Sequence, residues 1–440
     1  MQHTQQYLMD VWSGRIVMSS SDDDQQNSDD GESDGGWCYE REAEKHQTTV
    51  VRHKRPCNSS VDTAAVTARG LRAARRAASK SLSLLDIITS DVGQQILHEV
   101  SRLSVRRLWI CRSVNRAFRA LCTAALQRVP RVVVGGQDFF EGERPSQWLQ
   151  VIDFSTLRWS TLPALPEPRV EAGMVGLPDG TLVCAGGMVF CETTSWYQTL
   201  SVPVLQPGSS WLELPPLSIP RIDGHMVQLH DGRILFLGGT NVGSGSVEYP
   251  DIDVADVEVY TMGGDAWGFV APMLQPRSAF AACVMSNGEL IVAGGIFGDG
   301  DVATESAEVY NPATDVWSLI PRVPEACREA DCGWELQDGR FCVRGRGGKT
   351  GSSTRVCYAL SHAKNSWEEV WVNESRCGGP TAVPIRGGGC LIAGGMDPEN
   401  GDSLSTVELW DEESGNSYAL PTTMRYALGF TYATTLHVNA

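Results

Sequence analysis

An internal repeat is the feature that most constrains what this chain can fold into. One arginine marks each unit and recurs every 48 to 56 residues over the last three quarters of the chain. The six marks are Arg169, Arg221, Arg277, Arg328, Arg376 and Arg425. A unit of this length cannot bury a core alone, so the units are expected to stack and share one.

Each unit carries the same succession of turn and strand signals. In the second unit a turn pair, Asp231-Gly232, precedes an apolar stretch at 234–237 and a glycine pair, Gly238-Gly239. A hydrophobic residue then stands seven positions before an aromatic residue in most units. Four short strands in about 50 residues are typical of one propeller blade. The sequence therefore predicts a mainly β fold, a six-bladed β-propeller over residues 129–440.

The two ends of the repeat array predict how the propeller closes. Of its inner hairpin, the first unit contains only the second half, residues 132–136. The missing half matches residues 425–433 at the far end of the chain. We therefore expect the C-terminal strand to pair into the first blade and close the ring, which removes the open edge of an unfinished array.

Two regions of different composition precede the array. Residues 1–80 are polar and charged, first acidic and then basic, and are expected to be a disordered tail. Their basic stretch, residues 52–80, fits either an import signal or a solvated linker. In residues 81–128 apolar residues recur at spacings of three and four, which predicts a small helical module. A module of this size has to lean on a partner or on the next domain.

Charge and cysteine content disfavour several classes of function. The chain of 440 residues has a formal net charge of -17, which disfavours nucleic acid and acidic membranes and favours neutral or basic protein partners. No stretch is long and apolar enough for a transmembrane helix, and no signal-peptide pattern opens the chain. The 13 cysteines lack paired spacing and are expected to be buried thiols. An intracellular protein, cytoplasmic or nuclear, is therefore expected.

The landmarks of the array resemble those of kelch repeats. The glycine pair, the hydrophobic–aromatic spacing and starts such as Pro220-Arg221 recur in phase over residues 131–440. Residues 96–121 resemble an F-box, and an F-box directly before kelch repeats is similar to the F-box/kelch family. This resemblance implies a substrate-recognition subunit of an SCF-type cullin–RING ubiquitin ligase. The F-box would bind the adaptor subunit and through it a cullin, and the propeller would bind the target protein.

The adaptor-binding role implied by this resemblance falls on the apolar residues Ile96, Leu97, Val100, Leu103, Val105, Leu108, Val114 and Phe118. The module departs from the family pattern at its start. Ser90-Asp91 stands where Leu-Pro is usual, and Gln94 and Gln95 replace expected leucines. Each lost apolar contact weakens binding by roughly 1.5–3 kcal/mol if the side chain would be fully buried. A kelch scaffold without a ligase role, capped by these helices, is therefore the alternative.

No constellation of catalytic residues is recognisable in the sequence. Motifs of serine hydrolases, nucleotide-binding loops and zinc proteases are missing from it. His225 is interpreted as a structural histidine at the start of an inner strand, and Cys327 and Cys332 lack a second pair at zinc spacing. A non-catalytic binding protein without metal or cofactor is expected. A metal-dependent propeller enzyme is the remote alternative.

The loops after the glycine pairs are rich in acidic residues. Loops at one end of a propeller emerge together, so these acids are expected to share a rim. We hypothesise that the rim receives a basic segment of the target protein; the alternative is that the acids only keep the propeller soluble. The residues assigned to this face are Glu171, Asp223, Tyr249, Asp251, Asp253, Asp299, Asp301 and Asp397. The repeated arginines are interpreted as structural, tying turns between blades.

Overall fold

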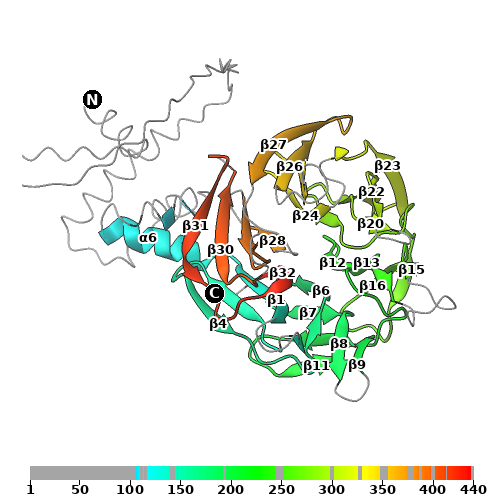
Figure 1. Ribbon diagram of the computed structural model, residues 1–440, viewed down its shortest axis with the longest axis horizontal. Helices are drawn as coiled ribbons and strands as arrows, with labels where there is room; N and C mark the ends of the chain where they lie inside the picture. The colour runs from blue at the N-terminus through cyan, green and yellow to red at the C-terminus, as the bar shows by residue number, and fades with distance from the viewer. Residues whose placement is uncertain are drawn as a thin grey trace, which may run out of the picture. The chain divides into compact units, whose positions relative to one another are not determined.

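In the part of the chain that the structure describes, β-strands make up nearly all of the regular structure (Figure 1). The computed structural model describes residues 106, 108–109, 112, 116–138, 144–145, 147–191, 195–242, 252–297, 302–325, 330–346, 355–373, 381–385, 389–397, 402–412 and 414–437. All of them belong to one compact unit, residues 62–440. The helix whose bounds lie in this part is α6 (Arg116–Gln127). Over the same ranges, no helix has the length and apolar character needed to cross a bilayer.

Six antiparallel sheets of four or five strands follow one another along the chain. The first sheet contains β1 (Arg131–Asp138), β2 (Arg144–Pro145), β3 (Gln150–Asp153), β4 (Arg158–Thr161) and β32 (Gly429–Leu436). The second contains β6 (Gly173–Gly176), β7 (Leu182–Ala185), β10 (Pro203–Leu205) and β11 (Trp211–Glu213). The third contains β12 (His225–Gln228), β13 (Ile234–Leu237), β16 (Val257–Tyr260) and β17 (Gly268–Val270).

The remaining three large sheets repeat the same order of strands. The fourth contains β18 (Ala281–Val284), β19 (Leu290–Ala293), β22 (Ala307–Asn311) and β23 (Val316–Ile320). The fifth contains β24 (Ala330–Glu335), β25 (Phe341–Arg346), β26 (Arg355–Leu360) and β27 (Trp367–Asn373). The sixth contains β28 (Thr381–Pro384), β29 (Cys390–Ala393), β30 (Thr406–Asp411) and β31 (Asn416–Thr423).

Short strands extend some loops into ribbons. β5 (Arg169–Val170), β8 (Met188–Cys191) and β9 (Ser195–Gln198) form one small sheet. Two further ribbons pair β14 (Thr240–Asn241) with β15 (Ile252–Asp253) and β20 (Ile296–Phe297) with β21 (Val302–Ala303). The hairpins β8–β9, β14–β15 and β20–β21 each follow a glycine pair.

The first sheet joins the two ends of the repeat array. β1 pairs antiparallel with β32, so that Arg131 lies opposite Leu436 and Val134 opposite Ala433. The innermost strands of successive sheets also contact one another in the order β32, β6, β12, β18, β24, β28 and again β32. Figure 1 shows the sheets arranged about a common centre. The mainly β fold expected from the repeats is confirmed.

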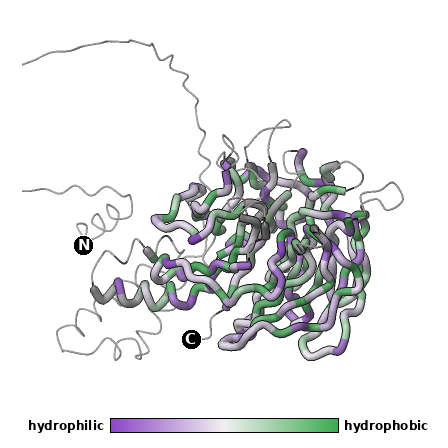
Figure 2. The backbone as a smooth tube through the Cα atoms, turned by 60° about the horizontal axis from the view of Figure 1, so that its bottom comes forward, coloured by the Kyte–Doolittle hydropathy of each residue, from purple (hydrophilic) through white to green (hydrophobic). Residues whose placement is uncertain are grey.

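The second strand of a sheet is the most deeply buried, because sheets pack against both of its faces. Every residue of β7, β13, β19 and β29 is buried. The outer strands β11 and β17 are largely exposed instead. Figure 2 shows the hydrophobic parts of the chain running through the packed strands. This gradient explains why the apolar stretch before each glycine pair is the strongest strand signal in the sequence.

The glycine pairs stand where neighbouring backbones come closest. Gly238 has a φ of +56° and Gly239 a φ of +94°. A Cβ on Gly238 would lie 2.5 Å from the carbonyl oxygen of Arg277, and one on Gly239 would lie 2.5 Å from that of Ile222. Any side chain would therefore push adjacent strands apart.

A tryptophan on the outer strand links each of four sheets to the connection before it. The indole Nε1 of Trp267 donates to the Pro215 carbonyl oxygen at 2.9 Å, and that of Trp317 donates to the Ala271 carbonyl oxygen at 2.8 Å. Trp211 and Trp367 make the corresponding bonds. The aromatic position of these repeats therefore joins each sheet to the one before it.

Candidate functional site

The connections between strands divide the large sheets into two ends. In an antiparallel sheet whose strands run up and down, the first and third connections lie at one end and the second and fourth at the other. We call the end that carries the first and third connections the turn end; it holds the tight hairpins, such as that between β12 and β13. The other is the loop end, where the glycine pairs, the ribbons and the repeated arginines lie.

Three of the repeated arginines are buried and hold the loop end together from inside. Arg221 is fully buried, and its guanidinium donates to the carbonyl oxygens of Gly238 and Asp256, each at 3.0 Å. Its Nη2 also lies 2.7 Å from the carboxylate of Glu258, which is equally buried. Burial lowers the pKa of Arg221, while the Glu258 charge acts in the opposite direction. The structural interpretation holds for Arg169, Arg221 and Arg277, whereas Arg425 is exposed and Arg328 and Arg376 lie outside the described residues.

The carboxylate of each buried pair also caps the chain that crosses between sheets. Glu308 pairs with Arg277 at 2.6 Å and accepts the backbone N–H groups of Leu274 and Gln275 at 2.7 and 3.1 Å. Glu258 accepts those of Ser218 and Ile219 in the same way. A buried carboxylate with three donors is well satisfied, so these glutamates belong to the scaffold and are not open to a ligand.

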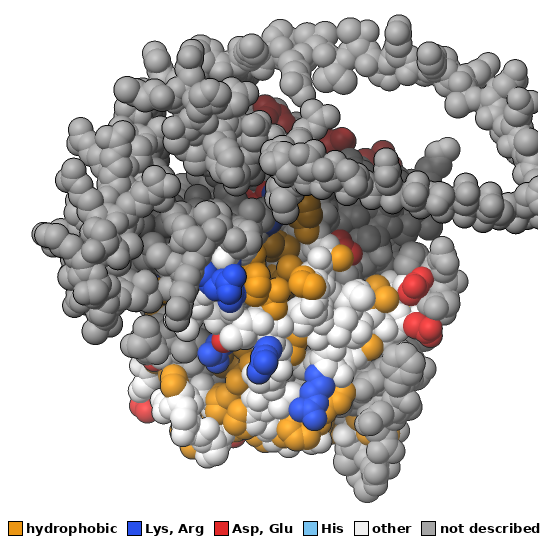
Figure 3. Space-filling model, turned by 90° about the vertical axis from the view of Figure 1, so that its left-hand side faces the viewer, with side chains coloured by type: hydrophobic (Ala, Val, Ile, Leu, Met, Phe, Trp, Pro, Cys, Tyr) orange, Lys and Arg blue, Asp and Glu red, His pale blue; other side chains and the backbone are white. Residues whose placement is uncertain are grey.

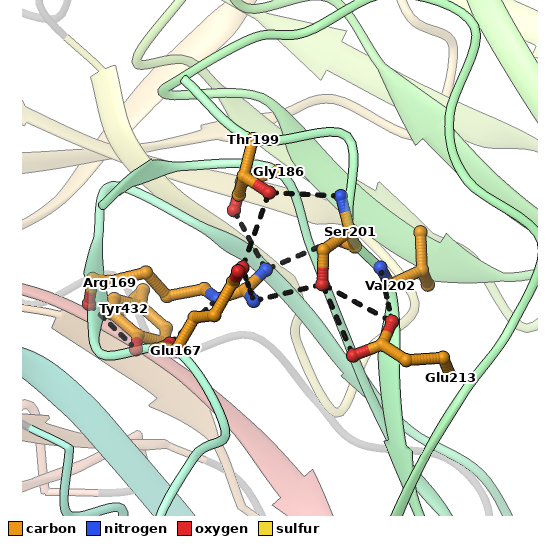
Figure 4. Close-up of polar contacts among 8 residues, drawn as sticks. All are labelled: Glu167, Arg169, Gly186, Thr199, Ser201, Val202, Glu213 and Tyr432. Carbon is orange, nitrogen blue, oxygen red and sulfur yellow. Dashed lines mark hydrogen bonds and ion pairs between the residues drawn. The ribbon is translucent and has the colours of Figure 1, made fainter. Parts of the chain in front are cut away.

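The second sheet reaches the same result with different residues (Figure 4). Arg169 donates to the carbonyl oxygens of Gly186 and Ser201 at 3.2 and 3.1 Å. Its Nη2 lies 3.4 Å from the Glu167 carboxylate and donates to the Ser201 hydroxyl, which in turn donates to Glu213, so a half-exposed ion pair and a relay take the place of the buried pair. The hydroxyl of Tyr432, on β32, donates to the Arg169 carbonyl oxygen at 3.2 Å. The C-terminal strand is therefore tied to the second sheet as well as to the first.

Two of the residues assigned to the substrate face line up at the inner side of the loop end. Glu171 and Asp223 each stand two residues after a repeated arginine, with φ of +54° and +51°, and Ala279 follows with +47°. The backbone N–H of Asp223 donates to the Glu171 carbonyl oxygen, and that of Ala279 to the Asp223 carbonyl oxygen, both at 3.0 Å. Burial raises the pKa of the Glu171 carboxyl. A left-handed backbone at non-glycine residues costs of order 1–3 kcal/mol and persists only where its surroundings fix it.

Asp253 is occupied within the fold. Its Oδ1 accepts the hydroxyl of Thr240 at 2.7 Å and that of Ser278, which is buried, at 3.3 Å. It therefore fastens the β14–β15 ribbon to the start of the fourth sheet. Asp397 lies at the loop end of the sixth sheet, where its backbone N–H donates to the Asp402 carbonyl oxygen. The other assigned residues, Tyr249, Asp251, Asp299 and Asp301, lie outside the described residues.

A cavity of about 620 Å³ opens at the loop end of the fourth sheet. Phe297, Leu319 and Ile320 supply apolar lining, and Thr304 and Arg322 supply polar groups. Leu319 is 69% exposed, the largest value among the exposed large hydrophobic residues described. The acidic residues of the loops predicted a binding face at this end of the molecule, but the cavity was not predicted. The signal for the cavity in the sequence was Leu319, an apolar residue at an outward-facing position of the outer strand β23.

The helical segment, by which we mean the described residues from 106 to 127, lies at the turn end of the first and sixth sheets. The Arg106 guanidinium is 4.0 Å from the centre of the Tyr418 ring and 3.9 Å from the Asp411 carboxylate. The Trp109 Nε1 donates to the Phe154 carbonyl oxygen at 3.0 Å. These contacts reach the β30–β31 and β3–β4 hairpins, so the segment bridges two sheets.

One apolar cluster merges the helical segment with the propeller strands. It includes Leu108 and Leu126, each 1% exposed, together with Val132 of β1 and Leu409 of β30. Leu108, one of the residues implied in adaptor binding, therefore packs within the chain. The helix of Phe118 is described but its side chain is not, and Ile96, Leu97, Val100, Leu103, Val105 and Val114 lie outside the described residues. The expectation that the module leans on the next domain agrees with this shared core.

The groups that hold a metal in other proteins do not gather in the described part of this chain. Over those residues, three or more His, Cys, Asp or Glu side chains nowhere converge as metal ligands would. His225 is half-buried, and burial lowers its pKa to about 4, so it is neutral near pH 7. Its ring centre lies 6.0 Å from that of Phe280, which fits the structural interpretation.

Known proteins resemble this chain in sequence and in fold. Residues 277–324 match the family model described as the Kelch motif. F-box protein AFR from Arabidopsis thaliana is 27% identical over 28% of this chain and 31% of its own length. Kelch-like protein 30 from Homo sapiens is 26% identical over 75% of this chain and 55% of its own length. The chain thus spans about a third to about half of these relatives.

A solved structure shares the fold at low sequence identity. The structure of YjhT matches with a TM-score of 0.50 at 14% identity, over 62% of this chain and 91% of that one. Taken with the Kelch motif and the names of the relatives, this confirms the β-propeller fold and the resemblance to kelch-repeat proteins, including the F-box/kelch family.

Proposed function

We propose that this kelch-repeat protein is the substrate-recognition subunit of an SCF-type cullin–RING ubiquitin ligase. The observation that carries the proposal is the helical segment, which packs into the same core as the first and sixth sheets. An F-box fixed in this way would hold the adaptor subunit at the turn end of the propeller. The loop end would remain open for a target protein, and ubiquitin transfer would be performed by the partner subunits.

The proposal includes the number of blades and the closure of the ring. We take each large sheet as one blade, so that the propeller has six, and β32 as the strand that closes the first. The pairing of β1 with β32 and the cyclic order of the inner strands support this arrangement. Closure gives β1 the inner partner that its own repeat lacks, which suits a protein that displays its loops on a rigid frame.

The loop end is the part of the propeller best suited to a basic target segment. Glu171 and Asp223 stand at its inner side, and the cavity beside Leu319 offers an apolar recess further out. A segment that carries lysine or arginine beside an apolar residue would satisfy both features. Asp251, Asp299 and Asp301 remain part of this proposed face. We propose a cytoplasmic or nuclear location and no catalytic role for the chain itself.

A binding assay between the full chain and the purified SCF adaptor tests the proposal. We expect micromolar or tighter binding, abolished by a Leu97→Asp, Leu103→Asp double substitution in the F-box-like module. Leu319→Asp, at an exposed position of the loop end, is the matched control and should bind the adaptor like the wild type. Circular dichroism of each variant separates lost binding from lost folding.

A kelch scaffold without a ligase role is the second candidate. It is favoured by the burial of Leu108 within the chain and by the match to Kelch-like protein 30, which covers far more of this chain than the match to an F-box protein. A folded chain that fails to bind the adaptor would support the scaffold and reject the ligase proposal. Metal analysis of the purified protein tests the remote alternative of a metal-dependent enzyme.

A further inference from the structure

Arginines gather around the β3–β4 hairpin at the turn end of the first sheet. In the register of β1 with β3, Val132 lies opposite Ile152, which brings Arg131 opposite Asp153. In the next pair of strands Asp153 lies opposite Arg158. Directly opposed residues share one face of a sheet, so two arginines flank a single carboxylate. The distance between Arg131 Nη2 and Asp153 Oδ2 is 3.8 Å.

The helical segment adds further arginines to the same hairpin. The Arg112 Nη1 donates to the Ser155 carbonyl oxygen at 2.8 Å, and its guanidinium stacks 4.2 Å from the centre of the Trp109 ring. The Arg119 Nε donates to the Arg112 carbonyl oxygen at 3.2 Å. Arg128 is exposed in the link between α6 and β1. We name this surface the arginine face; it consists of Arg112, Arg119, Arg128, Arg131 and Arg158.

The fold itself leaves much of this positive charge unbalanced. Asp153 is engaged in its own turn, because its Oδ1 accepts both the backbone N–H and the hydroxyl of Ser155, at 2.7 and 2.6 Å. Arg128 and Arg158 form no side-chain hydrogen bond or ion pair with any described residue. Arg340, which is partly exposed, differs in that its guanidinium lies 2.8 Å from the carboxylate of Asp338.

An excess of arginine is unusual on a chain whose formal net charge is -17. Figure 3 shows lysine and arginine side chains interspersed with hydrophobic ones on the side of the propeller that carries α6. The planar guanidinium forms paired hydrogen bonds with carboxylates and phosphates, and adjacent apolar surface favours a protein segment as the source of those groups. The net negative charge disfavours nucleic acid and anionic membranes, whose many charges act over long range.

We infer that the arginine face docks an acidic segment of a protein partner, rich in glutamate or aspartate. This partner is distinct from the basic target proposed for the loop end, since the two surfaces lie at opposite ends of the sheets and carry opposite charge. The inference does not depend on a ubiquitin-ligase role, because it rests on the charges and contacts of the first sheet and α6 alone.

Fluorescence anisotropy with the full chain tests the inference. The probe is a short fluorescein-labelled peptide of alternating glutamate and serine, and its counterpart with phosphoserines distinguishes carboxylate from phosphate recognition. An Arg128→Gln, Arg158→Gln double variant removes two guanidinium groups that no described residue binds. We expect about tenfold weaker binding at low salt and a shallower dependence of affinity on salt concentration.

The matched control is an Arg322→Gln, Arg425→Gln double variant, which removes the same charge from exposed positions at the loop end. It should bind the peptide like the wild type. Equal affinity of the wild type and the Arg128/Arg158 variant would overturn the inference, and so would equal losses in both double variants, because the attraction would then be diffuse. Tighter binding of a DNA duplex or of phosphatidylserine vesicles than of either peptide would also reject a protein segment as the occupant.

Discussion

The third and fourth sheets differ from the first in how they balance charge at the loop end. In the fourth, buried Arg277 and Glu308 form an ion pair that also caps the chain entering the sheet. In the first, the position of the glutamate is taken by Gln150, fully buried, which donates to the Tyr426 carbonyl oxygen and accepts the Tyr426 N–H. The repeated arginine of that unit, Arg425, is exposed.

This difference teaches that a buried arginine at this position comes with a carboxylate, directly in the third and fourth sheets and through Ser201 in the second, whereas the first sheet has lost both. A buried carboxylate without its guanidinium, or the reverse, costs several kcal/mol. The uncharged side chain of Gln150 both accepts and donates a hydrogen bond at this position. Arg425 therefore leaves no buried charge unpaired when it lies outward. Where the ends of the array meet, backbone pairing with β32 and the helical segment replace the repeated ion pair.

Removal of β32 is expected to have the largest effect, because the first sheet depends on this strand where the other sheets do not. Deletion of residues 429–440 takes away the partner of β1 and leaves a row of unpaired backbone groups at the centre of the molecule. We expect loss of soluble, cooperatively folded protein, measured by size-exclusion chromatography and thermal unfolding. Deletion of residues 438–440 alone is the control. A monomeric and cooperatively melting product of the longer deletion would contradict the importance of this pairing.

Breaking the ion pair of a complete repeat should have the next largest effect. Glu308→Gln leaves the buried Arg277 charge uncompensated and weakens the caps of Leu274 and Gln275, at about 3–5 kcal/mol. Thermal unfolding should show a large decrease in midpoint. Glu305→Gln, three residues away and 37% exposed, should change it little. A midpoint for Glu308→Gln equal to that of the control would reject a structural role for the pair.

The contribution of the helical segment to the first sheet can be measured at Leu126. Leu126→Ala opens a cavity in the cluster shared by α6, β1 and β30 and should lower the free energy of unfolding by about 2–5 kcal/mol. Leu319→Ala, on the exposed outer strand of the fourth sheet, is the matched control and should cost far less. Equal and small changes in urea unfolding would mean that the helical segment is peripheral to the fold.

The smallest expected effect is the difference in free energy of unfolding between substitutions of two tryptophans at equivalent positions of their repeats. Trp267 donates to the Pro215 carbonyl oxygen, whereas the buried Nε1 of Trp159 has no acceptor among the described residues. Trp267→Phe should therefore lose about 1 kcal/mol more than Trp159→Phe, in which no such bond is broken. Urea unfolding of the two variants gives the difference directly. A larger loss at Trp159 would show that the indole N–H is bonded in solution.

Regular landmarks made most of the fold predictable. A glycine with positive φ, a buried apolar strand and an interlocking tryptophan each follow from local chemistry that recurs in most units. The acid partners of the arginines were missed, although Glu258 and Glu308 share a signal: each stands two residues before a tyrosine of the same strand. Alternation along a strand places those two side chains on one face, which a scan for charged residues at buried positions would have found.

The candidate site was harder to predict because exposure is decided by tertiary contacts. Asp253 is indistinguishable in sequence from a free loop acid, yet two hydroxyls from different repeats donate to it. Leu108 fits an adaptor-binding helix equally well, but the first and sixth sheets bury it. Nothing local in either sequence window records these partners, which come from segments far away along the chain.

The pairing of β1 with β32 also bears on how the protein is made. About 300 residues separate the two strands, so β1 leaves the ribosome long before its partner is synthesised. At about 5–20 residues per second this interval is of order 15–60 s. During that time the nascent chain exposes an unpaired hydrophobic strand, a form that chaperones bind, while the intermediate sheets can already assemble. Translation speed over the last repeat is therefore expected to influence how much of the protein reaches the native state.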